Sequence, residues 1–432
     1  MRVNFGLTKF ANKKTNQREN VILDTSRTIN GHILLAGASG TGKTHQLRRI
    51  ISEMSGQEPG IRFHILDVHG DLDTGGASSC MFSESTPYGI NPLRVDADPH
   101  MGGVRKRARG FISSLSRTST KLGSKQEAAL YNLLNELYEQ HGFFADDPAS
   151  WRVDRDVRTQ PNGPKRHPTI SDLRALAEWQ LKQLATGAGS DALKRLDELS
   201  RKVRQFHKRL DKVDDADTAQ LDKARTDCID LYRQFVESIQ TGDELLQFIR
   251  YSGRDVLQSV YERIRNLESS GVFRPHKPDF DPQASVWRYD ISALSRDEQI
   301  LFVEFVTQEM FAGARRKGHT ERPRDFVVID EAHAFVSDDP DHVLNVVIKE
   351  ARKFGLGLIL ASQSLGHFPD DIIANTAVKT ILGLDEMFHA QTARKLSIDQ
   401  KRFTWIVPRK TALVQIKKAG DTSNRYIDVE LP

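Results

Sequence analysis

Residues 33–44 read I-L-L-A-G-A-S-G-T-G-K-T, a short apolar run that leads directly into a glycine-rich loop. Residues 37–44 have the G-x-x-x-x-G-K-T spacing of a phosphate-binding loop, and helix-compatible sequence follows from His45 to Met54. In a strand–loop–helix unit of this kind, backbone N–H groups and the start of the helix face nucleotide phosphates. The residues that we expect to cradle the phosphates are Gly37, Ala38, Ser39, Gly40, Thr41, Gly42, Lys43, Thr44 and His45.

Two side chains of this loop have expected roles in binding ATP and Mg²⁺. Lys43 is predicted to reach the β- and γ-phosphates, and the Thr44 hydroxyl is predicted to ligate Mg²⁺. The alternative is a glycine-rich turn that fits the pattern by chance. The agreement of strand, loop, lysine and hydroxyl favours the nucleotide site over that alternative.

The composition is that of a globular protein without a disulfide framework. The 432 residues are 38% hydrophobic and 28% charged, and the net charge of +4 permits a nucleic-acid partner without requiring one. The two cysteines, Cys80 and Cys228, lack C-x-x-C spacing, so we expect neither a disulfide framework nor a thiolate metal site. No run of 18 apolar residues and no secretion signal occurs, so we expect a cytoplasmic protein without an integral membrane segment.

Four apolar runs are suited to buried parallel strands, and each is followed by a polar loop and helix-like sequence. They cover residues 33–36, 61–68, 326–329 and 356–361. This alternation predicts an α/β fold with a mostly parallel sheet, whose ligands bind at the carboxyl ends of the strands.

A charged, helical segment separates the second run from the third. We expect an ATPase core formed by residues 1–100 and 283–432, interrupted by an all-helical insertion over residues 101–282. Within the insertion, residues 126–138 have amphipathic helix spacing, residues 191–240 read as a long helical hairpin, and residues 154–168 look irregular.

Adjacent acids end the third apolar run and predict the second half of the nucleotide site. Asp330 is expected to support Mg²⁺, and Glu331 to polarise the attacking water. Acids at a strand end can also be helix caps, but the upstream phosphate loop favours the catalytic interpretation. The string from Asp330 to His333 also spells the DEAH box of a helicase superfamily. We discount that match, because those helicases carry two tandem motor domains and this chain has one interrupted domain.

Three further residues are candidates with weaker support. Gln363 ends the fourth apolar run, where a side-chain amide could sense the γ-phosphate and position water. Arg352 could reach across a subunit boundary as an arginine finger, although such a residue taken alone is more often a solvated helix residue. His69 follows the second run, and without metal-ligand spacing around it we favour a histidine of no catalytic function.

Together these segments resemble the HerA/FtsK superfamily of ring-forming ATPases, and most of all its HerA branch and the related conjugation and type IV secretion ATPases. The resemblance covers nearly the whole chain. It rests on N-G-H-I-L-L-A-G-A-S-G-T-G-K-T (30–44), L-D-V-H-G-D (66–71), G-I-N-P-L (89–93), R-Y-D-I-S-A-L (288–294), V-I-D-E-A-H (328–333), E-A-R-K-F-G-L-G-L-I-L-A-S-Q (350–363) and A-N-T (374–376).

The resemblance implies a RecA-like core in a homo-hexameric motor that threads duplex DNA, with Arg352 as the finger supplied in trans. Two features depart from the family pattern. The usual H-G-E at the second strand is His69-Gly70-Asp71 here, with an acid one methylene shorter. Only about thirty residues precede the phosphate loop, too few for the N-terminal β-barrel through which HerA proteins usually dock a nuclease.

The sequence leaves three functions open. The first is a DNA translocase that works with a nuclease or other effector in DNA processing or anti-phage defence, with basic segments such as residues 104–109 as candidate DNA contacts. The second is a conjugation or type IV secretion motor that docks on a membrane complex. The third is a nucleotide-gated scaffold, which the intact Glu331 disfavours, because a scaffold needs no water-activating acid.

Overall fold

The computed structural model describes residues 1–11, 16–118, 121–153, 158–159, 163–186, 190–210, 218–237, 249–421, 423 and 425–432. The chain packs into two compact units. The first combines Met1–Ile90 with Arg274–Pro432, and the second is Asn91–Phe273. The first unit therefore draws on both ends of the chain and contains the phosphate loop.

The first unit is built on an eleven-stranded sheet with the order β2-β1-β13-β12-β11-β3-β10-β9-β4-β8-β5. Seven neighbouring strands, from β11 to β5, run parallel, and β12, β13, β1 and β2 extend the sheet in antiparallel pairs. The strands are β1 (Arg2–Thr8), β2 (Asn20–Asp24), β3 (Ile33–Ala36), β4 (Arg62–Asp67), β5 (Ser78–Met81), β8 (Val286–Asp290), β9 (Asp325–Ile329), β10 (Leu356–Ser362), β11 (Val378–Ile381), β12 (Thr411–Ile416) and β13 (Ile427–Glu430).

The predicted α/β class and the four predicted strands are confirmed, because they correspond to β3, β4, β9 and β10. These strands are neighbours in the sheet, in the order β3-β10-β9-β4. Sequence reasoning missed the antiparallel extension. Its first strands alternate buried and exposed residues, so they lack the continuous apolar runs by which the central strands were recognised.

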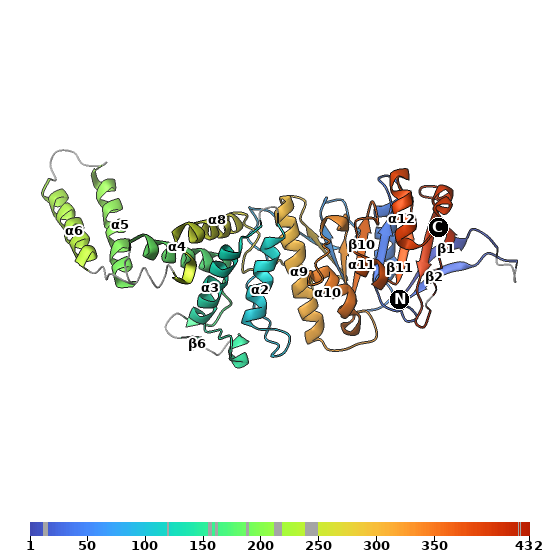
Figure 1. The fold of residues 1–432 in the computed structure, drawn as a ribbon, viewed down its shortest axis with the longest axis horizontal. Coiled ribbons are helices and arrows are strands. Elements are labelled where there is room, and N and C mark those ends of the chain that lie inside the picture. The colour runs from blue at the N-terminus through green and yellow to red at the C-terminus, as the bar shows by residue number, and fades with distance from the viewer. Residues whose placement is uncertain are drawn as a thin grey trace. The chain divides into compact units, whose positions relative to one another are not determined.

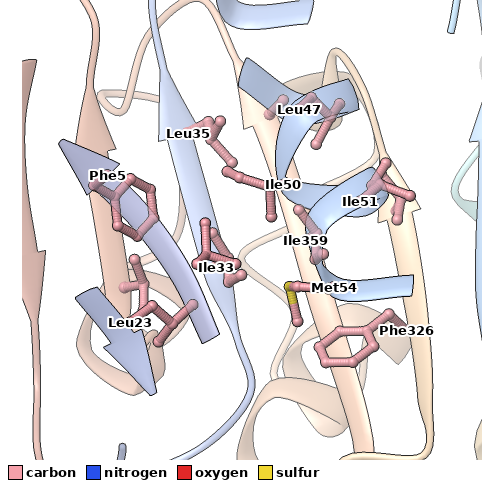
Figure 2. Packing of buried hydrophobic residues seen from close by; sticks show 14 of the residues in the cluster. Phe5, Leu23, Ile33, Leu35, Leu47, Ile50, Ile51, Met54, Phe326 and Ile359 are labelled. Atoms are coloured by element: carbon pink, nitrogen blue, oxygen red, sulfur yellow. The ribbon is translucent and has the colours of Figure 1, made fainter. Parts of the chain in front are cut away.

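Helices cover both faces of this sheet. On one face, Leu47, Ile50 and Met54 of α1 (Lys43–Ser55) pack over a layer that includes Ile33 and Leu35 of β3 and Ile359 of β10 (Figure 2). On the other face, Phe302 of α9 (Arg296–Arg316) packs against Tyr289, with the ring centroids 6.2 Å apart. The first unit is completed by α10 (Val343–Glu350), α11 (Asp370–Asn375), α12 (His389–Leu396) and the short 3₁₀ helices η2 (Ala332–Ala334), η3 (Ala351–Phe354), η4 (Glu386–Phe388) and η5 (Gln400–Trp405).

The secondary structure described in the second unit is helical apart from one short two-stranded piece. Its helices α3, α4 and α8 pack against one another, and α5 packs along α6 (Figure 1). The elements are α2 (Val104–Ser116), α3 (Ser124–Gln140), η1 (Pro148–Trp151), β6 (Arg158–Thr159), β7 (Gly163–Pro164), α4 (Ile170–Thr186), α5 (Ser190–Leu210), α6 (Thr218–Glu237) and α8 (Arg254–Ser269). The hairpin predicted over residues 191–240 is formed by α5 and α6. Its residues 211–217 and 238–240, and residues 154–157 and 160–162 of the predicted irregular segment, lie outside the described residues.

A search of the described residues finds no helix with both the length and the apolar character needed to cross a bilayer.

Two stacked aromatic rings lie on neighbouring strands in the parallel part of the sheet, and this packing yields a stability prediction. Phe63 of β4 and Phe326 of β9 are fully buried, with ring centroids 4.9 Å apart. Phe326→Ala should lower the free energy of unfolding by about 3–5 kcal/mol, because it removes buried apolar contacts and leaves a cavity. Met387→Ala, at a side chain that is 75% exposed, should change it by less than about 0.5 kcal/mol. Equal effects in chemical denaturation would contradict this assignment of the core.

Candidate nucleotide site

The phosphate loop takes its shape from close backbone approaches that glycine permits. Gly42, which precedes α1, has φ = +96°, in the left-handed region that side chains rarely adopt. A Cβ on Gly37 would collide with the Thr41 hydroxyl, which folds back to donate a 2.7 Å hydrogen bond to the Ala38 carbonyl. The loop therefore closes on itself around Thr41.

Neighbouring strands anchor the loop at its first residues. The Gly37 N–H donates to the Ser362 carbonyl of β10 at 3.0 Å, and the Ala38 N–H donates to the carbonyl of Gly383, just after β11, at 2.8 Å. Because β10 and β11 flank β3 in the sheet, these bonds fix the loop at the carboxyl edge. Helix α1 begins at Lys43, and the first N–H groups of a helix have no partner within it. The Lys43, Thr44 and His45 amides are thus the helical donors available to an anion.

The Lys43 ammonium lies between the two acids at the end of β9. Its Nζ pairs with the Glu331 carboxylate and lies 3.5 Å from Asp330 Oδ1. The three side chains are only 6–14% exposed. Two carboxylates therefore share one lysine in a largely desolvated position, which leaves a net negative charge where a divalent cation would be favoured.

The backbone and the side chain of Glu331 are both constrained. Its backbone is in the left-handed region, with φ = +49°, which is uncommon for a residue other than glycine. Gln363 Nε2 donates to its Oε1 at 3.3 Å, and His333 Nδ1 lies 3.2 Å from its Oε2. Burial acts to raise the pKa of Glu331, but the Lys43 ammonium outweighs this and holds that pKa below its usual value.

Asp330 differs from its neighbour in charge behaviour. It is 4% exposed, and burial raises its pKa even though the Lys43 charge acts in the opposite direction. Its Oδ1 accepts a 2.8 Å hydrogen bond from the Glu331 N–H. The two acids are therefore tied together through the backbone, with one carboxylate buried and the other facing Lys43 and Gln363.

A buried ion pair shapes the loop after β4. Asp67 accepts hydrogen bonds from the N–H groups of His69, Gly70 and Leu72, and Arg288 of β8 pairs with it at 2.7 Å. This places His69 and Asp71 in the pocket wall together with Asp330 and Glu331. Asp71, which stands where the family usually has a glutamate, thus lines the candidate site. Our sequence interpretation gave His69 no function, whereas the structure places it beside the candidate catalytic groups.

Arg409 lines the pocket and was missed by sequence reasoning. Its Nε donates to the Gly40 carbonyl at 3.1 Å, and its backbone N–H donates to the Thr41 carbonyl at 3.2 Å. Its φ of +64° directs the chain back toward the loop. Arg409 lies 365 positions after Thr44, the last residue of the motif (409 − 44), in a segment without a recognisable motif, so the sequence carries no signal for this contact.

The predicted site residues divide into those that line one cavity and those that do not. The loop residues from Ala38 to His45 line one cavity of about 650 Å³ with Asp330, Glu331 and Gln363. Gly37 lies at the loop base, and Arg352 does not line this cavity. Arg352 is exposed on η3, with no ion pair to any described residue.

The residues present fit ATP and Mg²⁺. The cavity falls in the size range of small-molecule sites, with backbone donors and Lys43 on one wall and carboxylates on the other. The Thr44 hydroxyl and the Asp330 carboxylate are hard oxygen donors of the kind that Mg²⁺ prefers.

Comparison with solved structures identifies the fold. VirB4 of Thermoanaerobacter pseudethanolicus is similar, with a TM-score of 0.63 and 15% identity over 99% of this chain and 96% of that chain. The plasmid coupling protein TrwB in complex with ADP and Mg²⁺ has a TM-score of 0.51 and 14% identity, over 100% of this chain and 95% of that chain. At this level of sequence identity, these similarities show a shared fold.

The family follows from the sequence itself. No curated protein matches the chain in sequence. The family model described as "Helicase HerA, central domain" matches residues 12–309, which is more than half of the chain. The resemblance drawn from the sequence motifs is thereby confirmed, and the chain belongs to the HerA central-domain family of P-loop ATPases.

Proposed function

We propose that this protein is an ATP-driven DNA translocase of HerA type that assembles as a homo-hexamer and works with a nuclease or other effector in DNA processing or anti-phage defence. The observation that carries the proposal is the convergence of Lys43, Glu331 and Gln363 on one cavity, from the ends of three neighbouring parallel strands. Ligand sites of open α/β sheets lie at this edge.

Each residue then has a defined task in ATP hydrolysis. Lys43 and the amides of the loop would bind the phosphates, and Thr44 and Asp330 would hold Mg²⁺, whose charge would offset that of the phosphates. Glu331 accepts a proton from the attacking water, and Gln363 orients that water and Glu331. Lys43 is paired with Glu331 in the structure, and in this proposal the phosphates would take the place of Glu331 at the Lys43 ammonium and free the carboxylate.

Arg352 acts in this proposal on the neighbouring subunit. It is exposed and lies outside the cavity of its own chain, as a finger supplied in trans must. An arginine of this kind stabilises the charge that develops on the transferred phosphoryl group. The proposed hexamer brings Arg352 of one subunit to the nucleotide of the next.

The strongest candidate for a DNA contact is helix α5 of the second unit. Its exposed cations include Arg201, Lys202 and Arg204 in little more than one turn. The run on α2 that we singled out from the sequence is less available, because Arg105 pairs with Asp146 and Lys106 donates to the His100 carbonyl. Contacts with phosphates bind DNA without reading its sequence.

The second candidate is a conjugation or type IV secretion motor that docks on a membrane complex. The similarity in fold to VirB4 and TrwB favours it specifically. Both candidates use the same nucleotide residues, so stimulation by DNA in the absence of any membrane component is the property that separates them.

The first test concerns the chemical step. Glu331→Gln should lower the ATP hydrolysis rate by about 10²- to 10⁴-fold, because the amide cannot accept the proton from water. ATP binding should stay at least as tight as in the wild type, because Lys43 then has one carboxylate partner, Asp330, instead of two. Lys43→Ala should instead weaken binding itself. Fluorescent-nucleotide binding and steady-state turnover distinguish the two effects.

Matched controls for this test are Glu321→Gln and Lys410→Ala. Both alter exposed residues outside the cavity and should leave binding and turnover unchanged. Wild-type turnover in the Glu331 variant would remove that residue from the catalytic role.

The second test concerns the finger. Mixing Arg352→Ala subunits with Glu331→Gln subunits should restore part of the activity, because some interfaces then combine an intact arginine with an intact glutamate. Lys353→Ala, at the adjacent exposed cation, should retain activity without mixing. If mixed rings assemble but never exceed the summed rates of their parents, Arg352 does not act across subunits.

The third test concerns the substrate. Duplex DNA should stimulate ATP hydrolysis, and the apparent DNA affinity should fall with salt at a log–log slope of about −0.9 per phosphate neutralised. Replacement of Arg201, Lys202 and Arg204 by alanine should reduce this slope while leaving hydrolysis without DNA unchanged. Titration of the rate with DNA at several salt concentrations measures both quantities. No response to any DNA at low salt would favour the secretion motor.

A further inference from the structure

A second cavity, of about 590 Å³, lies in the first unit and shares no lining residue with the nucleotide site. It is lined by residues of α11, β11 and α12, which Figure 1 labels, and by Ser397, Lys417 and Tyr426. Four cations face it, namely Lys379, Arg394, Lys395 and Lys417, and Asp370 is the one acidic residue of its described lining.

Lys379 is the most unusual of these cations, because it is 2% exposed and has no carboxylate partner among the described residues. Its Nζ donates to the Thr376 carbonyl at 3.0 Å and to Gln415 Oε1 at 2.9 Å, both neutral acceptors. An ammonium buried without a counter-ion is costly. The two hydrogen bonds link Lys379 of β11 to Thr376 and to Gln415 of β12. A neutral donor could form the same bonds without the cost of burying a charge.

The neighbouring cations are also uncompensated. Lys417 Nζ donates to the Ala374 carbonyl at 3.3 Å, and neither it nor Arg394 forms an ion pair within the described part of the chain. Asp370 lies 3.4 Å from Lys395 Nζ, so that pair is balanced. The cavity wall therefore carries three basic side chains without a carboxylate partner among the described residues, namely Lys379, Arg394 and Lys417.

We propose that this cavity is a second ligand site, which binds a phosphate-bearing small molecule through Lys379, Arg394 and Lys417. Its size lies within the range of small-molecule sites. Arginine and lysine donate charge-assisted hydrogen bonds to phosphate oxygens, and phosphate charge would balance the three cations. Ile373 and Leu396 give the cavity an apolar part next to this cationic wall. The inference does not depend on ATP hydrolysis or on DNA.

The state of Lys379 gives the proposal an independent readout. Burial, together with repulsion from Lys417, lowers the pKa of Lys379 to about 7. At pH 8 this amine is therefore mostly neutral. An anion beside it favours the charged form and raises its pKa, so binding should take up protons from the buffer.

Calorimetry with pyrophosphate as the probe tests the site. The full chain carrying Lys43→Ala is used, because that substitution weakens binding in the nucleotide cavity. Arg394→Ala combined with Lys417→Ala should weaken the remaining pyrophosphate binding by about tenfold or more. The control variant, Lys418→Ala combined with Arg425→Ala, removes two exposed cations outside the cavity and should leave pyrophosphate binding unchanged. The single variant Arg394→Ala, at an exposed residue, serves if the double variant fails to fold.

The pattern of binding among these variants decides whether the cavity is a phosphate site. Weakening confined to the cavity variants, with proton uptake at pH 8 in buffers of different ionisation enthalpy, supports the site. Absence of pyrophosphate binding at low salt, or equal binding by cavity and control variants, overturns it. Binding of a short single-stranded oligonucleotide without binding of pyrophosphate or ATP would replace the small-molecule site by a nucleic-acid contact.

Discussion

The ion pair between Lys43 and the two acids that follow β9 is the interaction on which the candidate nucleotide site depends. It joins the first residue of α1 to the end of a strand that lies 287 positions away (330 − 43), across the whole inserted unit. The three side chains are nearly buried, so removing Lys43 leaves two carboxylates without their lysine, and an uncompensated charge in a buried pair costs about 3–5 kcal/mol. A ligand that carries its own negative charge can replace the carboxylates around Lys43 at much lower cost.

This interaction exists because of the strand order. β3 lies beside β10, and β10 lies beside β9, so the phosphate loop, Gln363 and the two acids emerge at the same edge of the sheet. The hydrogen bonds from the loop amides of Gly37 and Ala38 to Ser362 and Gly383 hold that edge together. The neighbouring strand β4 also contributes to this edge. Asp67 at its end accepts hydrogen bonds that order the loop carrying His69 and Asp71. The site is therefore a property of four adjacent parallel strands.

Residue patterns predicted the centre of this arrangement well. The strands buried on both faces are continuous apolar runs, and the groups at their ends, such as Lys43 and Glu331, occur in recognisable motifs. The antiparallel strands were missed because alternation in short, half-exposed segments such as β1 and β2 is a weak signal. Arg409 could not be predicted, because its contact with Gly40 arises from the return of the chain through the antiparallel part of the sheet.

The most direct measurement is an experimental structure of the full chain with a non-hydrolysable ATP analogue and Mg²⁺. We expect the analogue in the cavity of the phosphate loop, with Lys43 Nζ on its phosphates and separated from Glu331. We also expect Mg²⁺ close to Thr44 and Asp330, and Arg352 of a neighbouring subunit at the terminal phosphate. An analogue bound elsewhere, or a Lys43–Glu331 pair that stays intact with the analogue bound, would contradict the proposed nucleotide site.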